Sequence, residues 1–325
     1  MKESTTVPEI VKYLPYEDRP LDYQYKVTLQ KILQEGSLRG RVEFHGGEVQ
    51  KYFNNPMKFK MAYGFPVITD RDIGEYFHHA IAEIIGFIHG ATTLGELEKF
   101  GLPKWWWKRW TKVEHITNSD GSPKFDLPEN DIGEHLGRFS YGGIWGSYPD
   151  GKGGYINQWE NLIKAMMKSP SAFTHRVTNW YPPGIIVPDG KRQVVVAPCH
   201  GDVQIDLDVE RKLLTLIQLQ RSADVATGVP YNMIHYPTIG MMLSCVLGYE
   251  FDTYYHIMID SHIYMDKQLE NVKILLERES RRLPTVTLNF KPTGDPVKDF
   301  FSIRPEHFQL SDYDPHPKMK IDTEV

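Results

Sequence analysis

One stretch of the chain, residues 193–232, gathers side chains whose types could do chemistry together. Cys199 follows a proline at the end of an apolar run, and a cysteine thiolate is an intrinsically strong nucleophile. A second apolar run ends in Arg221 and Ser222, and a guanidinium paired with a hydroxyl suits a phosphate group. Both runs read as strands, so we predict that the thiol and the anion site lie at neighbouring strand ends.

Each of these residues also has a purely structural interpretation. A buried, inert thiol is the commoner state of a cysteine, and Arg221 could instead form a surface ion pair. Neighbouring His200 and Arg221 would stabilise a thiolate, which favours the catalytic interpretation of Cys199. The spacing of the 13 histidines and two cysteines matches no common metal site, and the usual nucleotide loops are absent. These residues alone predict a thiol-dependent enzyme that acts on an anionic small molecule and holds no metal.

The clearest helical pattern, residues 72–90, carries a carboxylate among apolar residues. Alanine, isoleucine and phenylalanine cover much of the helix circumference around Glu83, and Gly90 suits the helix end. Glu83 lies either at the edge of the helix, where it reaches solvent, or inside the protein. If it is buried, desolvation makes it a plausible proton donor or acceptor.

Aromatic residues are concentrated in two places. Residues 104–110 read K-W-W-W-K-R-W, and Trp107 and Trp110 share a helical face because they are three residues apart. They could stack on a planar ligand, although a core cluster is equally plausible. Residues 136–148 bring glycines and aromatic residues together, as the wall of a pocket might.

The remaining elements describe one mixed domain. We expect an irregular N-terminal arm over residues 1–20, which carries three prolines, and a catalytic domain over residues 21–325 with a polar insertion near 111–135. The loop after residue 36 contains Arg39 and Arg41 and could close over an anion or be a solvated turn. Helices are expected at 21–35, 156–168, 231–247 and 266–281, strands at 175–181, 253–264 and 283–290, and a loop at 182–191. Several strands in a row after residue 175 favour the α+β class.

Composition sets the broad class of protein. The chain has 325 residues, 24% of them charged and 41% hydrophobic, with a net charge of −5, which argues against nucleic-acid and membrane partners. Two cysteines make no disulfide framework, so a reducing compartment is expected. No apolar run reaches the roughly 18 residues of a membrane-spanning helix, and the N-terminus has no apolar signal core. A cytoplasmic protein is expected.

Three motifs in this order and spacing resemble the thymidylate synthase family: A-P-C-H, Q-R-S-A-D-V-A-T-G-V-P-Y-N and D-S-H-I-Y. G-F-P-V-I-T, the helix that carries Glu83, W-K-R-W and the terminal P-H-P-K-M-K-I are similar too. The resemblance covers about residues 24–325. It implies a single domain with a large mixed sheet flanked by helices, and a homodimer formed through the sheet face.

The resemblance also implies a reaction. The family transfers a one-carbon unit from 5,10-methylenetetrahydrofolate to C5 of a pyrimidine nucleotide. A thiolate that adds to C6 turns the ring into an enolate, which then attacks the folate. The matching nucleophile is Cys199, Glu83 would manage protons at O4 through water, and Tyr141 would help remove the C5 proton. The catalytic residues implied are Cys199, Glu83, Tyr141, His200 and Asp224.

The same resemblance implies two sets of binding residues. An asparagine amide offers a donor and an acceptor to O4 and N3–H of uracil, so Asn232 favours dUMP over a cytosine nucleotide. The residues implied for the nucleotide are Arg221, Ser222, Gln220, Asn232, His262 and Tyr264. The residues implied for the folate are Trp107, Trp110, Asp224, Gly228, Tyr231 and Val325.

The chain departs from the family at the phosphate. Where the family carries two adjacent arginines that reach the partner subunit, this chain reads S-P-S-A-F-T-H-R. Arg176 is the candidate substitute there, and Arg39 or Arg41 is the candidate in the altered phosphate loop. Three functions stay open: synthesis of dTMP, which the water-excluding Trp107 and Val325 favour, hydroxymethylation of dUMP or a related nucleotide, and non-catalytic binding of nucleotide or RNA. Retention of the catalytic and base-reading residues argues against the last.

Overall fold

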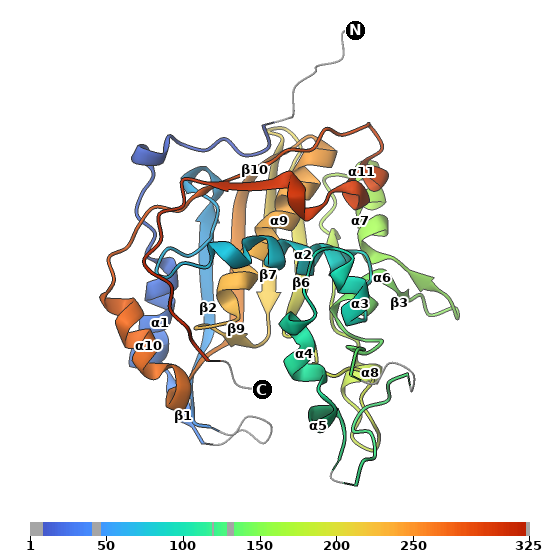
Figure 1. The fold of residues 1–325 in the computed structure, drawn as a ribbon. Coiled ribbons are helices and arrows are strands. Elements are labelled where there is room, and N and C mark those ends of the chain that lie inside the picture. Colours follow the sequence, from blue (N-terminus) through green and yellow to red (C-terminus); the bar gives the residue numbers. More distant parts are fainter. Residues whose placement is uncertain (1–8, 41–46, 119, 129–132, 323–325) are drawn as a thin grey trace.

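One large mixed sheet carries the fold in the part of the chain that the structure describes (Figure 1). The computed structural model describes residues 9–40, 47–118, 120–128 and 133–322. The strands of the sheet are β1 (Ser37–Arg39), β2 (Val49–Lys60), β5 (Arg176–Val177), β6 (His200–Asp208), β7 (Leu213–Gln220), β8 (Ala223–Asp224) and β9 (Glu250–Tyr264). Their order is β1-β2-β9-β7-β6-β5, with β8 added to β9. Strand β9 runs parallel to β7 and β8 and antiparallel to β2.

Two small strand pairs and a set of helices complete the described fold. The pairs are β3 (Tyr148–Pro149) with β4 (Tyr155–Ile156), and β10 (Thr285–Leu288) with β11 (Phe308–Ser311). The helices are α1 (Gln24–Glu35), α2 (Phe77–Ile88), α3 (Leu94–Glu98), α4 (Trp105–Thr111), α5 (Val113–Ile116), α6 (Tyr141–Gly146), α7 (Gln158–Lys168), α8 (Pro182–Ile185), α9 (Val229–Leu247), α10 (Met265–Glu277) and α11 (Pro296–Ser302). Short 3-10 turns lie at Tyr16–Asp18, Met61–Tyr63, Gly74–Tyr76 and Pro305–His307. The predicted fold, a large mixed sheet flanked by helices, is confirmed.

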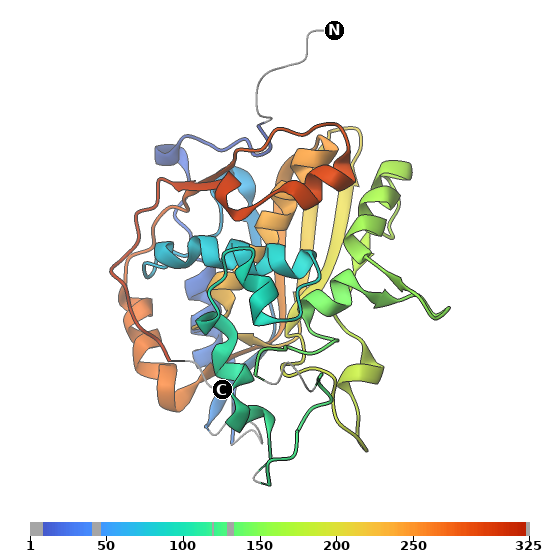
Figure 2. The same ribbon diagram turned by 45° about the vertical axis from the view of Figure 1, so that its right-hand side comes forward.

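Helix α9 forms the centre of the core. It packs on β7 and β9 on one side and against α2 on the other, and Figures 1 and 2 show α2 crossing in front of it. Its apolar residues lie all round the helix, as expected of a helix buried on every side. It ends at Gly248, whose φ of 71° is the left-handed conformation that glycine adopts readily. The helix predicted over 231–247 is therefore confirmed, with a start two residues earlier.

The predicted strand that ends at Cys199 is wrong. Residues 194–199 have irregular backbone, and β6 begins just after them at His200. Pro198 has no N–H to give to a sheet, which is consistent with a strand that starts only beyond it. Strand β7 does end at Gln220, and the antiparallel register pairs His200 with Gln220. The thiol and the arginine are therefore neighbours because a strand begins where its partner ends.

Other expectations were also adjusted by the structure. The strand predicted over 175–181 shrinks to the two residues of β5, and the loop predicted over 182–191 begins with the short helix α8. Of the N-terminal arm, the structure describes residues 9–20, which contain one 3-10 turn and pack on the domain: Ile10 is buried, and its carbonyl accepts the N–H of Phe251 at 2.7 Å. The loop predicted after residue 36 starts as strand β1. Arg41 lies outside the described residues.

Candidate active site

The backbone of Cys199 is held from two sides. Its N–H donates to the hydroxyl of Tyr141, on α6, at 2.7 Å. Its carbonyl accepts the N–H of Arg221 at 2.9 Å and of Ser222 at 3.3 Å, just beyond the end of β7. The thiol is half-buried, and its sulfur lies 3.6 Å from the carbonyl of Ala197. The structure therefore brings together the predicted nucleophile, the predicted tyrosine and the predicted anion site.

Arg221 is fixed beside the sulfur. Its Nη2 lies 3.7 Å from Cys199 Sγ, and its guanidinium lies over the ring of Trp180 at 5.0 Å from the ring centroid. Nε donates to the carbonyl of Pro198 at 2.7 Å, and Nη2 donates to the carbonyl of Ala197 at 2.8 Å. A guanidinium held in this way keeps positive charge next to the thiol, where it can stabilise a thiolate or attract an anionic ligand.

A cavity of about 510 Å³ opens beside these two residues. Cys199 and Arg221 line it, and so does Arg176, the residue predicted to replace the missing arginines. Arg176 Nη2 lies 3.8 Å from Asp202 Oδ1, and Thr178 donates to the same oxygen at 2.6 Å. One chain therefore supplies two guanidinium groups to a cavity that contains the predicted nucleophile.

His200 and Tyr141 lie side by side next to Cys199. Their ring centroids are 4.5 Å apart, and His200 Nδ1 lies 2.5 Å from the hydroxyl of Tyr236. Burial lowers the pKa of His200 well below its usual 6.5, and the nearby His235 lowers it further. Burial also raises the pKa of Tyr141 well above 10, and the charge of Cys199 adds to the effect. Both groups are therefore neutral near pH 7 and can exchange hydrogen bonds without carrying charge.

Glu83 is buried, so the solvent-exposed alternative is wrong. Trp107 Nε1 donates to its Oε1 at 2.7 Å, and Trp106 Nε1 donates to its Oε2 at 3.0 Å. His235 Nε2 lies 3.1 Å from the same Oε2. Trp110 contacts Trp107, with ring centroids 5.0 Å apart, rather than Glu83. Two indole N–H groups from α4 and the imidazole of His235 from α9 thus surround the carboxylate of α2.

Two residues of this arrangement were missed in the sequence. Trp106 was not predicted because it does not share the helical face of Trp107 and Trp110. In the structure, both Trp106 and Trp107 donate to Glu83. His235 was missed although it lies three residues after Asn232 and therefore shares a face of α9 with it. The helical spacing was the available signal.

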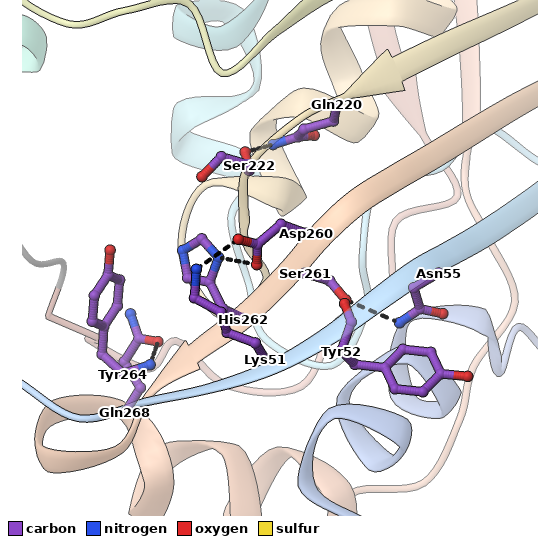
Figure 3. Close-up of polar contacts among 10 residues, drawn as sticks. All are labelled: Lys51, Tyr52, Asn55, Gln220, Ser222, Asp260, Ser261, His262, Tyr264 and Gln268. Carbon is purple, nitrogen blue, oxygen red and sulfur yellow. Dashed lines mark hydrogen bonds and ion pairs between the residues drawn. The ribbon is translucent and has the colours of Figure 1, made fainter. Parts of the chain in front are cut away.

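The amide of Asn232 belongs to a chain of buried polar groups. Gln220 Nε2 donates to Asn232 Oδ1 and to the carbonyl of Ser222, both at 3.0 Å; Figure 3 shows the second bond. His256 Nε2 lies 2.7 Å from Gln220 Oε1, and the hydroxyl of Tyr254 lies 3.0 Å from His256 Nδ1. Burial lowers the pKa of His256 to about 3, so this imidazole is neutral near pH 7.

A second polar cluster lies where β8 and β9 end. The parallel register places Asp224 opposite His262, and Gln268 Nε2 donates to both carboxylate oxygens of Asp224 at 3.0 and 3.1 Å. His262 Nδ1 lies 3.3 Å from Asp260 Oδ1, whose other oxygen pairs with Lys51 at 2.7 Å (Figure 3). Lys51 and Asp260 were not predicted, although Asp260 precedes His262 by two residues and shares its strand face.

The other predicted residues fall around these two clusters. The backbone N–H of Tyr264 donates to Gln268 Oε1 at 3.0 Å. Gly228 precedes α9, and the ring of Tyr231 lies 5.1 Å from that of Trp106. Gln268 also donates to the carbonyl of Asp322 at 3.2 Å, which ties the end of the described chain to Asp224. Val325 lies outside the described residues.

A model of the protein family described as thymidylate synthase matches residues 23–325. The match includes every described residue named above for the site, from Lys51 to Asp322. Within the described part of the chain, no helix is long and apolar enough to cross a membrane. No group of three or more His, Cys, Asp or Glu side chains there could hold a metal ion.

Proposed function

Because the chain belongs to the thymidylate synthase family, we propose that it transfers a one-carbon unit from 5,10-methylenetetrahydrofolate to C5 of dUMP, giving dTMP and dihydrofolate. The family makes the protein a transferase of nucleotide biosynthesis.

One observation carries the proposal: the thiol of Cys199 lies beside a fixed cation at the wall of a cavity. A thiolate stabilised by Arg221 would add to C6 of the pyrimidine and move electron density toward C5 and O4. The enolate would attack the methylene carbon of the folate. Removal of the C5 proton would then release tetrahydrofolate, which would return a hydride to the exocyclic methylene. The final departure of the thiolate would free Cys199.

Three buried side chains of the site, Tyr141, Glu83 and Asn232, support the proton steps and the reading of the base. Tyr141 stands against the backbone of the nucleophile, where its hydroxyl could help remove the C5 proton. Glu83 accepts hydrogen bonds from two indoles, which keeps its carboxylate oriented for exchange with a water at O4. Asn232 would bond O4 and N3–H of uracil, since Gln220 uses one lone pair of its oxygen and His235 one hydrogen of its NH₂ group, which leaves one acceptor site and one donor.

The phosphate site of the proposal uses cations of the same chain. Arg221 and Arg176 line the cavity, and Ser222 follows Arg221. The segment where the family carries two adjacent arginines has Phe173 instead, and this side chain is 90% exposed. Arg176 would therefore replace charge that the family draws from a partner subunit. We also propose that His262 and Tyr264 bond the sugar hydroxyl.

The folate would lie on the aromatic side of Glu83. Tyr231 packs against Trp106 there, and Trp110 packs against Trp107. A flat ring system could stack on these aromatic side chains. Asp224 and Gly228 would contribute polar contacts, and Val325 would close the pocket. A stacked folate excludes water from the exocyclic methylene, and this favours hydride transfer over hydroxymethylation.

A covalent trapping experiment tests the proposal. The protein is incubated with 5-fluoro-dUMP and methylenetetrahydrofolate and analysed by denaturing mass spectrometry. We expect an adduct on Cys199 that Cys199→Ala abolishes, whereas the matched variant Cys245→Ala retains it. Nucleotide binding without an adduct would establish a non-catalytic binder instead. With dUMP, we expect dihydrofolate absorbance and dTMP by mass, and 5-hydroxymethyl-dUMP without dihydrofolate would refute the synthase assignment.

The proposal includes a homodimer formed through the sheet. Side chains alternate along β7, where Leu214 and Leu216 are fully buried and Leu213, Ile217 and Leu219 are half-exposed. One face of the sheet thus retains partly exposed apolar residues that a second copy could cover. Light scattering in solution tests this: a monomer at micromolar concentration would contradict it. A cytoplasmic location remains an expectation from composition.

A further inference from the structure

His235 lies between the two groups that would manage the pyrimidine ring. This α9 side chain is 1% exposed. Its Nδ1 is 3.4 Å from Asn232 Nδ2, and its Nε2 is 3.1 Å from Glu83 Oε2. A side chain buried to this degree between a base-reading amide and a carboxylate contacts both at once, so the protonation of its two nitrogens affects both.

A single backbone carbonyl sets the direction of the whole chain of hydrogen bonds. The carbonyl of Ser222 can only accept, so the end of Gln220 that faces it must be the NH₂ group. The other end of the Gln220 amide is then an oxygen, which accepts from His256 Nε2. His256 Nδ1 in turn accepts from the hydroxyl of Tyr254. The tautomer of His256 therefore follows from the position of one carbonyl.

The hydrogen-bond directions from Gln220 toward Glu83 follow in the same way. The Gln220 NH₂ group also donates to Asn232, so the Asn232 atom that faces it is oxygen and the other is NH₂. For this NH₂ group to donate to His235, His235 Nδ1 must be unprotonated, so the ring proton is on Nε2. That proton faces the Glu83 carboxylate, although the N–H is poorly aligned with Oε2. Such contacts commonly tighten when substrate binds.

We propose that His235 is a positioning residue that couples the amide of Asn232 to the carboxylate of Glu83, an inference that rests on the proposed function. Through Nδ1 it holds the Asn232 NH₂ group, which keeps the amide in the orientation that reads uracil. A flipped amide would place two donors face to face at Gln220. When substrate binds, the N–H at His235 Nε2 orients Glu83 Oε2 for a water at O4.

Two conservative variants separate these roles. Asparagine at position 235 can imitate Nδ1 and keep the acceptor for Asn232, but it is too short to reach Glu83. Glutamine can imitate Nε2 and keep a donor to Glu83, but it places no acceptor at the Nδ1 position. We expect His235→Asn to lower kcat roughly 10²-fold with little change in KM for dUMP. We expect His235→Gln to keep kcat and raise KM for dUMP roughly fivefold to tenfold.

The contrast between the two variants is the test. Because only His235→Asn loses the contact with Glu83, we also expect the pH profile of kcat to shift in His235→Asn and to stay unchanged in His235→Gln. The ionisable groups that face His235 are Glu83 from α2, His200 from β6 and His256 from β9, with Tyr236 beside it on α9. The inference would be overturned if both variants changed kcat and KM by equal amounts, or if neither variant changed them.

A second measurement needs no turnover. NMR of isotope-labelled histidine in the ligand-free protein reports which ring nitrogen carries the proton, and the signal missing from His235→Asn identifies His235. We expect a proton on Nε2 and a bare Nδ1. A proton on Nδ1 would refute the hydrogen-bond chain whatever the protein catalyses. Failure of the proposed function would appear separately, as the absence of an adduct on Cys199 of the wild-type protein.

Discussion

The hydroxyl of Tyr141 accepts a hydrogen bond from the backbone N–H of Cys199 across 2.7 Å. This bond joins α6 to Cys199, the residue directly before β6, and holds the backbone of Cys199 without engaging its sulfur. The tyrosine ring is itself fixed, because it stacks on Phe87 of α2 with ring centroids 5.0 Å apart. The position of the thiol therefore depends on contacts among three separate elements.

Replacing Tyr141 with phenylalanine should weaken both stability and reactivity. The ring stack would remain, but the N–H of Cys199 would lose its acceptor at a cost of about 1–3 kcal/mol. We expect a lower free energy of unfolding in urea and slower formation of the 5-fluoro-dUMP adduct. A variant that matches the wild-type protein in both measurements would show that water replaces the hydroxyl.

Each indole that donates to Glu83 should contribute to turnover. Trp106→Phe and Trp107→Phe each remove one N–H from the carboxylate while keeping an aromatic ring. A hydrogen bond to a charged group contributes about 1.5–3 kcal/mol, so we expect kcat to fall by about tenfold or more with nucleotide affinity unchanged. Trp105→Phe is the matched control, since Trp105 is 58% exposed. A similar loss in the control would point to a general effect on α4.

Asn232→Asp should move the base preference toward cytosine. An aspartate offers only acceptors, which suit the exocyclic amino group of cytosine and repel O4 of uracil. We expect the ratio of kcat/KM for dUMP to that for dCMP to fall by at least about tenfold. The measurement compares both nucleotides in one assay. An unchanged ratio would mean that other residues read the base.

Arg176→Ala should weaken binding of the phosphate. We expect KM for dUMP to rise several-fold at low salt and the difference from wild type to shrink as salt screens the charge. The nucleoside deoxyuridine, which has no phosphate, should bind both proteins equally. Arg211→Ala is the matched control, because Arg211 pairs with Asp208 on the surface. Equal effects of the two variants would remove Arg176 from the phosphate site.

Asp70 should make stability depend on pH. Burial raises the pKa of Asp70 from 3.8 to about 6, so the folded state binds this proton more tightly than the unfolded state. The stability contribution is present below about pH 4 and is lost as pH rises through about 6. Its size is about 3 kcal/mol at most, from the change in pKa.

The permanently neutral variant Asp70→Asn tests this sign. Between about pH 4 and about pH 7, its unfolding free energy should rise relative to wild type, because only the wild type loses a proton from this buried site. Urea denaturation at both pH values measures the difference, and Asp189→Asn, at an exposed site, controls for the loss of one charge. A constant difference between Asp70→Asn and wild type would show that Asp70 keeps a normal affinity for its proton.

Local pattern was enough for several parts of the fold. Periodicity predicted α2 and α9, and the end of β7 fell at Gln220 as expected. The strand before Cys199 was wrong, because an apolar run bounded by a proline looks the same whether it forms a strand or packs as irregular chain. The sequence also contains no local sign that β2 pairs with β9 along most of its length, since that register joins residues roughly two hundred positions apart.

The sequence by itself determined which chemical groups are present and the family to which their order and spacing belong, because a motif is a local property of the chain. It could not decide whether Glu83 was buried, which tryptophans reach it, or that His235 stands between it and Asn232. Those relationships depend on how α2, α4 and α9 pack around the sheet. Burial and hydrogen-bond direction arise only when distant elements meet, so the tertiary structure alone decided them.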